Sequence, residues 1–146
     1  MKKTSSDLLL LDVNVLLAIA WPNHQFHAAV TATLASGNPW ATCALRQLGF
    51  IRLSSNPAAV PAAKSPQAAA DLLARLVADS LHVYLHELPA PASEGIRGVF
   101  GALLGHRQIT DAYLLALAAA NDAVLVTFDR RLQSTGAGKV KVRLLG

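Results

Sequence analysis

The chain has 146 residues, of which 53% are hydrophobic and 15% are charged, and it carries a formal net charge of +4. This composition excludes a disordered chain, and the length suits one domain with its own core, so we expect a single domain over residues 1–146. The positive charge favours an anionic partner such as nucleic acid or an acidic protein. Cys43 is the sole cysteine, which excludes an internal disulfide and fits a reducing compartment.

The amino-terminal segment has the outline of a secretory signal, because the basic Met1–Lys3 precedes a largely apolar stretch from Leu8 to Ala20. Asp12 and Asn14 interrupt that stretch and leave apolar pieces that are short for a signal core. No part of the sequence approaches the ~20 consecutive apolar residues that a membrane span requires. We therefore expect a cytoplasmic protein without membrane attachment.

Strands and helices are expected to alternate along the chain. Short apolar runs without helical spacing predict buried strands, and apolar residues that recur every third or fourth position predict helices. The predicted strands are Leu8–Leu11, Trp40–Cys43, His82–His86, Val124–Thr127 and Val140–Leu144. The predicted helices are Val13–Ala20, His24–Ser36, Ala44–Leu53, Ser65–Ala78, Pro91–Leu104 and Ile109–Ala120. This alternation predicts the α/β class, with a parallel sheet covered by helices on both faces.

Three acidic residues lie next to the apolar runs. Asp12 directly follows the strand Leu8–Leu11, and Asp129 stands two residues after the strand that ends at Thr127. Asp111 opens the helix that runs directly into that second strand. Ligands of an open parallel sheet bind beyond the carboxyl ends of its strands. We therefore expect Asp12, Asp111 and Asp129 to meet at this edge of the sheet.

Each of these acids also fits a purely structural role. Asp12 suits the cap of the helix that begins at Val13, Asp111 suits a first helical turn, and Asp129 suits the cap of a short turn. However, the chain has only nine Asp and Glu residues, and these three have the most apolar surroundings, where an uncompensated charge is costly. A hard divalent cation such as Mg²⁺ prefers carboxylate oxygens and would offset that cost.

The segments around these acids resemble, in order, the three acidic motifs of the PIN domain family. They are Leu8–Leu17, Ile109–Ala118 and Val124–Asp129. More narrowly, the chain resembles VapC-type toxins of toxin–antitoxin systems, because Leu48–Pro57 is similar to the LGF-R-TNP stretch of one branch of them. The match runs from Leu8 to Asp129, which is nearly the whole chain.

The resemblance implies a three-layer α/β/α sandwich with a central, mainly parallel sheet of about four to five strands. It implies a metal-dependent endoribonuclease that uses Mg²⁺ or Mn²⁺ and hydrolyses RNA by metal-activated water. It also implies a homodimer that a small VapB-like antitoxin inhibits. By position, Asp12, Asp111 and Asp129 match the catalytic, metal-binding acids of the family. Asn14 and Thr127 match the supporting polar positions, Asn14 by holding the Asp12 loop and Thr127 by bonding a carboxylate or a metal-bound water.

Gln47 departs from this pattern, because most members of the family carry Glu at that position. An amide oxygen can accept a hydrogen bond or ligate a metal, but it carries no charge. We therefore expect weaker metal affinity, and the sequence does not support a second metal ion. Arg46 would weaken the site further if it points inward. A weakly active or degenerate PIN module that acts through protein or RNA binding therefore stays an alternative.

Two arginines are the candidate RNA contacts. Arg107 precedes Asp111, and Arg130 belongs to the basic carboxyl-terminal end of the chain. Contacts of this kind with phosphates give a salt-dependent affinity. Solvated loop arginines and a charged, aggregation-resistant edge strand explain the same residues without any RNA.

Two further classes of protein also carry an acid after an apolar strand. A haloacid-dehalogenase-like phosphatase needs a second acid where this chain has Asn14, and it needs a downstream Lys that the chain does not convincingly supply. A receiver-like module needs an acid pair after the first strand and an acceptor Asp after the third, where Glu87 stands. Both classes therefore fit less well than a nuclease.

Overall fold

A five-stranded parallel sheet forms the centre of the protein. The computed structural model describes residues 7–101, 105–132 and 141–145. The strands lie in the spatial order β3-β2-β1-β4-β5, and every neighbouring pair is parallel. Their bounds are Leu8–Leu11 (β1), Trp40–Cys43 (β2), His82–Leu85 (β3), Ala123–Thr127 (β4) and Val142–Leu144 (β5). The predicted α/β class with a mainly parallel sheet is confirmed.

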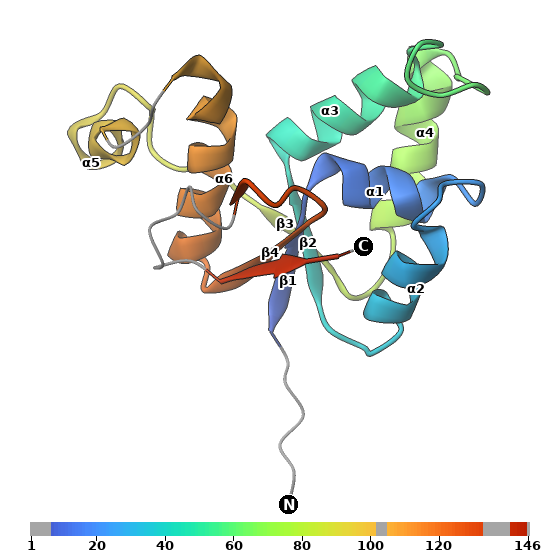
Figure 1. Ribbon diagram of the computed structural model, residues 1–146, viewed down its shortest axis with the longest axis horizontal. Coiled ribbons are helices and arrows are strands. Elements are labelled where there is room, and N and C mark those ends of the chain that lie inside the picture. Colours follow the sequence, from blue (N-terminus) through green and yellow to red (C-terminus); the bar gives the residue numbers. More distant parts are fainter. Residues whose placement is uncertain (1–6, 102–104, 133–140, 146) are drawn as a thin grey trace, which may run out of the picture.

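Helices cover both faces of this sheet. Their bounds are Val13–Ala20 (α1), His27–Leu34 (α2), Ala44–Ser54 (α3), Pro66–Val77 (α4), Glu94–Arg97 (α5) and Ile109–Ala120 (α6), with 3-10 turns at Gly98–Phe100 and His106–Gln108. Figure 1 shows α1 to α4 gathered on one side of the sheet, and α5 and α6 on the other. The arrangement is the expected three-layer sandwich. Among the described helices, none is long and apolar enough to cross a membrane.

The run Leu8–Leu11 is apolar throughout because β1 is buried on both faces. Side chains of a strand point alternately to its two faces. Leu9 and Leu11 accordingly pack with Phe50 of α3 in one core cluster, whereas Leu10 packs with Leu114 of α6 in the other. A helix layer on each side therefore requires an unbroken apolar run rather than an alternating one.

Two predicted helices differ from the observed ones. The helix expected over His24–Ser36 begins only at His27, because His24 to Phe26 form a turn in which the Phe26 N–H donates to His24 Nδ1. The helix expected over Pro91–Leu104 is wrong: the described part holds only α5 and one 3-10 turn, and residues 102–104 lie outside it. Glycines at 95, 98 and 101 weaken a helix there, since each costs up to about 1 kcal/mol relative to alanine.

The last strand begins later than predicted, since Lys141 is described and lies outside it. The strand expected over Val140–Leu144 is observed as β5, and residue 140 lies outside the described residues. β5 pairs with β4, which places it at one edge of the sheet. The remaining predicted strands and helices agree with the structure to within one residue at each end.

Candidate functional site

Asp12 ends β1 and caps α1, so its carboxylate sits at the carboxyl edge of the sheet. The Val13 N–H donates to Asp12 Oδ1 over 2.8 Å, as expected for a helix cap. The Thr127 hydroxyl donates to Asp12 Oδ2 over 2.8 Å, and the Asp12 residue is only 8% exposed. The capping role expected from the sequence is therefore observed, and the cap is a buried residue at the edge where the acids were expected to meet.

Thr127 connects two of the acids. It is fully buried at the end of β4, and its Oγ1 also accepts the N–H of Asp129 over 3.0 Å. One hydroxyl thus bonds the Asp12 carboxylate and the backbone of Asp129. This is the carboxylate contact that the sequence predicts for Thr127.

Asp129 forms the expected turn, with Arg131 as its partner. Asp129 Oδ1 accepts the backbone N–H and the Nε–H of Arg131, and Oδ2 accepts from Arg131 Nη2 over 2.9 Å. These hydrogen bonds from Arg131 hold the pKa of the Asp129 carboxyl below its usual value. The i+2 spacing of Arg131 from Asp129 is typical of a turn that an Asp side chain caps.

Asp111 comes to the same edge from the other side of the sheet. It lies in the first turn of α6, and only a short connection separates the end of that helix from β4. Partial burial raises the pKa of Asp111, and the negative charges of Asp12 and Asp129 raise it further, while Arg46 and Arg131 act in the opposite direction. The three acids therefore lie close enough to share one electrostatic environment.

Arg46 of α3 points inward to Asp12. Its Nη1 donates to Asp12 Oδ1 over 2.7 Å, and the two side chains are only 12% and 11% exposed. Within the described part of the chain, the buried Arg46 Nε has no hydrogen-bond partner. The structure thus shows the inward orientation of Arg46 that, on the sequence evidence, would weaken a metal site.

Gln47 hydrogen-bonds a residue of β2 and, among the described residues, none of the three acids. Its Nε2 donates to Thr42 Oγ1 over 3.0 Å, and that hydroxyl is hydrogen-bonded to His82 Nε2 over 2.8 Å. Burial lowers the pKa of His82, with Asp79 opposing the change, which favours the neutral ring in this network. The residue at the family's Glu position therefore serves the packing of β2 against β3.

Of the other residues selected from the sequence, Asn14 and Arg130 are exposed. Asn14 is exposed, and across the described residues its side chain forms no hydrogen bond, so its support of the Asp12 loop stays a prediction. Arg130 is exposed beside Asp129. Arg107 lies in the 3-10 turn before α6, but its side chain is outside the part that the structure describes.

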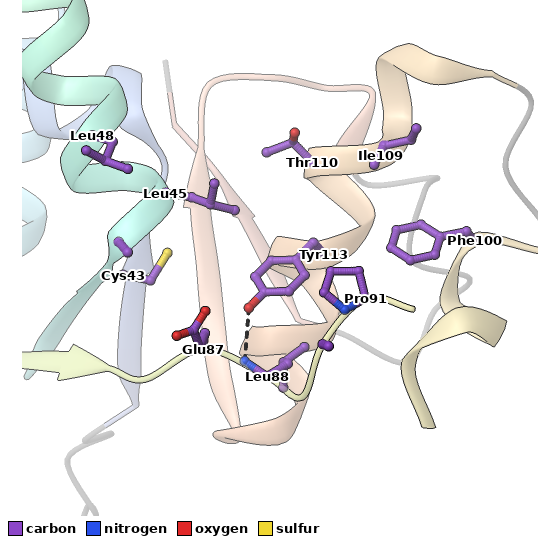
Figure 2. Close-up of a pocket in the computed structure, with 12 residues that line it drawn as sticks. Cys43, Leu45, Leu48, Glu87, Leu88, Pro91, Phe100, Ile109, Thr110 and Tyr113 are labelled. Atoms are coloured by element: carbon purple, nitrogen blue, oxygen red, sulfur yellow. Dashed lines mark hydrogen bonds between the residues drawn. The ribbon is translucent and has the colours of Figure 1, made fainter. Parts of the chain in front are cut away.

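A cavity of about 760 Å³ adjoins this cluster between α3, α6 and the segment after β3. Its lining is largely apolar and includes Leu45, Leu48 and Ile109, and Figure 2 shows the Tyr113 hydroxyl in this wall accepting the N–H of Leu88. Leu45 is next to Arg46 in sequence, but none of the three acids lines the cavity. The cavity therefore offers an apolar surface beside the acids, without the charges that a phosphate would need.

The donor chemistry at the acids suits a hard cation. Carboxylate oxygens are the ligands that Mg²⁺ and Mn²⁺ prefer. Among the described residues, no three His, Cys, Asp or Glu side chains stand in ligating positions around one point. Arg46 and Arg131 instead contact two of the three acids. The chemistry of these side chains thus suits a divalent cation. In this structure, however, Arg46 and Arg131 are paired with two of the carboxylates.

Comparisons with known proteins agree with this fold. The PIN domain family matches residues 9–138. Ribonuclease VapC39 of Mycobacterium tuberculosis is 40% identical over 136 residues, which cover 91% of this chain and 97% of that protein. Ribonuclease VapC38 of Mycobacterium tuberculosis is 39% identical over 126 residues, which cover 84% and 85%. A similar fold is found in the crystal structure of VapBC2 from Rickettsia felis bound to a DNA fragment from its promoter. The superposition covers 95% of this chain and 99% of the chain in that structure, with a TM-score of 0.61 and 13% sequence identity. That structure has the same fold.

Proposed function

Because the chain belongs to the PIN domain family and to its VapC-type members, we propose that it is a metal-dependent endoribonuclease, the toxin of a VapBC-like pair. The observation that carries the proposal is the convergence of Asp12, Asp111 and Asp129. They come from separate elements, and while burial raises the pKa of Asp111, the charges of Asp12 and Asp129 raise it further. Such a cluster is costly in the folded protein unless positive charge compensates it, and Arg46 and Arg131 contact only two of the three acids.

Asp12, Asp111 and Asp129 would hold a Mg²⁺ or Mn²⁺ ion. Such an ion supplies Lewis-acid activation of water and neutralises the charge that develops on the phosphate. Thr127 orients Asp12 Oδ2 and the backbone of Asp129 at once, so it fixes the relative position of two ligands. Asn14 would support the Asp12 loop from the exposed side.

RNA would approach this edge through the positive potential of the chain. Arg130 is exposed beside Asp129, and Arg107 precedes α6, so both would contact phosphates on either side of the acids. The net charge of +4 favours this encounter. Salt should therefore weaken RNA binding, with a slope set by the number of phosphates contacted.

The partners follow from the same family membership. VapC-type proteins pair with a small VapB-like antitoxin, and we infer the same for this chain together with a homodimer. The apolar cavity between α3 and α6, with Leu45, Leu48 and Ile109 exposed on it, supports burial against another protein. Co-expression with a small reading frame adjacent to the gene should block RNA cleavage.

The direct test is RNA cleavage by the purified chain, freed of any partner, in Mg²⁺ or Mn²⁺. We expect Asp12→Asn to reduce cleavage by about 100-fold or more, because it removes a ligand. Asp71→Asn is the matched control, since Asp71 is exposed on α4 and bonds only Gln67 within the described residues. Equal cleavage by the Asp12 variant and the wild type would refute the proposal.

Two observations favour a second candidate, a weakly active or degenerate module that acts by binding. Arg46 pairs with Asp12, and Gln47 is turned toward Thr42. Under this alternative, the chain would bind RNA or its partner but would not cleave RNA with any divalent ion. The cleavage assay, run beside an RNA-binding titration of the same preparation, separates the two candidates.

A further inference from the structure

Two guanidinium groups lie at the acid cluster. Arg46 bonds Asp12 and Arg131 bonds Asp129, and the charges of both arginines act on Asp111. The three carboxylates and two guanidiniums together carry a formal charge of minus one. A divalent cation that approaches this cluster therefore meets far less negative charge than three free carboxylates would offer.

The two arginines differ in how strongly they act. The Arg131 side chain is 78% exposed, so solvent screens its pair with Asp129. The Arg46 side chain is 12% exposed and faces a carboxylate that is 11% exposed. Screening is weak for such a buried pair, and removing one partner leaves an uncompensated charge. Arg46 is therefore the arginine that compensates the negative charge of Asp12 most strongly.

Arg46 is held by this charge rather than by a full set of hydrogen bonds. Among the described residues, its buried Nε has no hydrogen-bond partner, and its Nη1 bonds Asp12 Oδ1. A buried N–H without a partner is costly, and the ion pair has to offset that cost. If another cation neutralised Asp12, little in the described contacts would keep the guanidinium in place.

We propose that Arg46 sets the metal affinity of this site: its guanidinium takes the cation position at Asp12 Oδ1, and a divalent ion binds only as Arg46 withdraws. The inference rests on the proposed function, since it concerns the same metal site. It makes Arg46 a positioning residue, which acts on the metal through Asp12. Gln47 adds no charge to offset it, because Gln47 bonds Thr42 instead.

The test is the affinity of the full chain for Mn²⁺, measured by calorimetry without RNA. We expect Arg46→Gln to bind Mn²⁺ about tenfold or more tightly than the wild type. This figure corresponds to the low end of the coupling energies measured for close charge pairs. Arg46→Lys keeps the charge and should stay near the wild-type affinity. Arg52→Gln is the matched control, because it removes an exposed positive charge from the same helix and should change the affinity little.

A second measurement uses the wild type alone, in case Arg46→Gln does not fold. NMR of the guanidinium nitrogens reports on this contact, and comparison with Arg46→Lys assigns the Arg46 signal. We expect hindered rotation of the Arg46 guanidinium in chelator and free rotation after Mg²⁺ is added. Equal Mn²⁺ affinity of the wild type and Arg46→Gln, or a guanidinium signal that Mg²⁺ leaves unchanged while it binds, would overturn the inference and leave the proposed function standing. Failure of every variant to bind Mn²⁺ would overturn both.

Discussion

Asp12 and Asp111 stand in opposite electrostatic situations, although the sequence assigns them the same role. Asp12 accepts hydrogen bonds from Val13, Thr127 and Arg46, so its charge is well compensated. Asp111 is partly buried, and the nearby negative charges raise its pKa. One acid therefore stabilises the metal-free fold, while the other is held at a cost, which is typical of functional sites.

This contrast predicts opposite effects of two similar substitutions. In chelator, Asp12→Asn should lower the free energy of unfolding by about 2 kcal/mol, because Arg46 is left with an unpaired buried charge. Asp111→Asn should raise it by up to about 1 kcal/mol, because the repelled charge is removed. Urea unfolding of both variants measures the two effects, and destabilisation by both would contradict the assignment.

The pH dependence of the Asp111 variant provides a control. A carboxyl whose folded pKa is raised binds its proton more tightly in the folded state, so the wild type gains stability as pH falls through that pKa. The advantage of Asp111→Asn should therefore be largest at neutral pH and shrink toward the ordinary value of 3.8. An advantage that is independent of pH would point to packing rather than charge.

Only some of the site could be predicted from local sequence. Asp12 and Thr127 are predictable because each stands at the end of an apolar strand, and parallel strands bring such ends together. The partner of Gln47 is not predictable in this way, since its amide donates to Thr42 of β2, whose hydroxyl is also bonded to His82 of β3. The inward turn of Arg46 likewise depends on the packing of α3 over β1, which no local pattern encodes.

At the scale of elements, the site depends on how closely α3 approaches the start of α1. Gly49 lies in α3, and a Cβ built at this position would stand 3.2 Å from Val13 Cγ2. Val13 directly follows Asp12 and donates to its carboxylate. The glycine of the LGF stretch therefore permits a helix contact on which the placement of Asp12 and Arg46 depends.

Gly49→Ala should lower the free energy of unfolding by about 1 kcal/mol. Overpacking against Val13 costs about 1–3 kcal/mol, and the better helix propensity of alanine returns about 0.5–1 kcal/mol of it. Adding Val13→Ala should relieve the contact, so the double variant should be more stable than the sum of the two single effects predicts. Denaturant unfolding of the four proteins in this cycle tests the coupling, and strict additivity would show that the two residues do not interact.

Some helices and strands can likewise be predicted from local sequence, whereas others depend on packing. The strands β1, β2 and β4 are short, apolar and buried, so composition alone identifies them. The segment before α6 is harder, because its apolar residues have helical spacing while its glycines disfavour a helix. Only packing decides between these tendencies, and α5 ends after one turn.

At the scale of the whole molecule, two partly buried histidines make the free energy of unfolding depend on pH. Burial lowers the pKa of His24, with His27 adding to the change, and burial lowers the pKa of His82. They lie on different elements, His24 before α2 and His82 in β3. A histidine that is buried neutral must be protonated more readily in the unfolded chain, so acid should destabilise the fold at separate points.

The free energy of unfolding in chelator should therefore fall as pH drops below the ordinary histidine value of 6.5. The stability is fully present above that value and is lost as pH falls toward the lowered folded pKa, because the unfolded state takes up the proton first. His82→Gln can keep a bond to Thr42 without titrating, so its stability should fall less than that of the wild type between about pH 7.5 and about pH 5.5. Asp111 is present in both proteins and cancels from the difference. His86→Gln, at an exposed position, is the matched control. Parallel pH profiles for the wild type and His82→Gln would show that the acid sensitivity arises elsewhere.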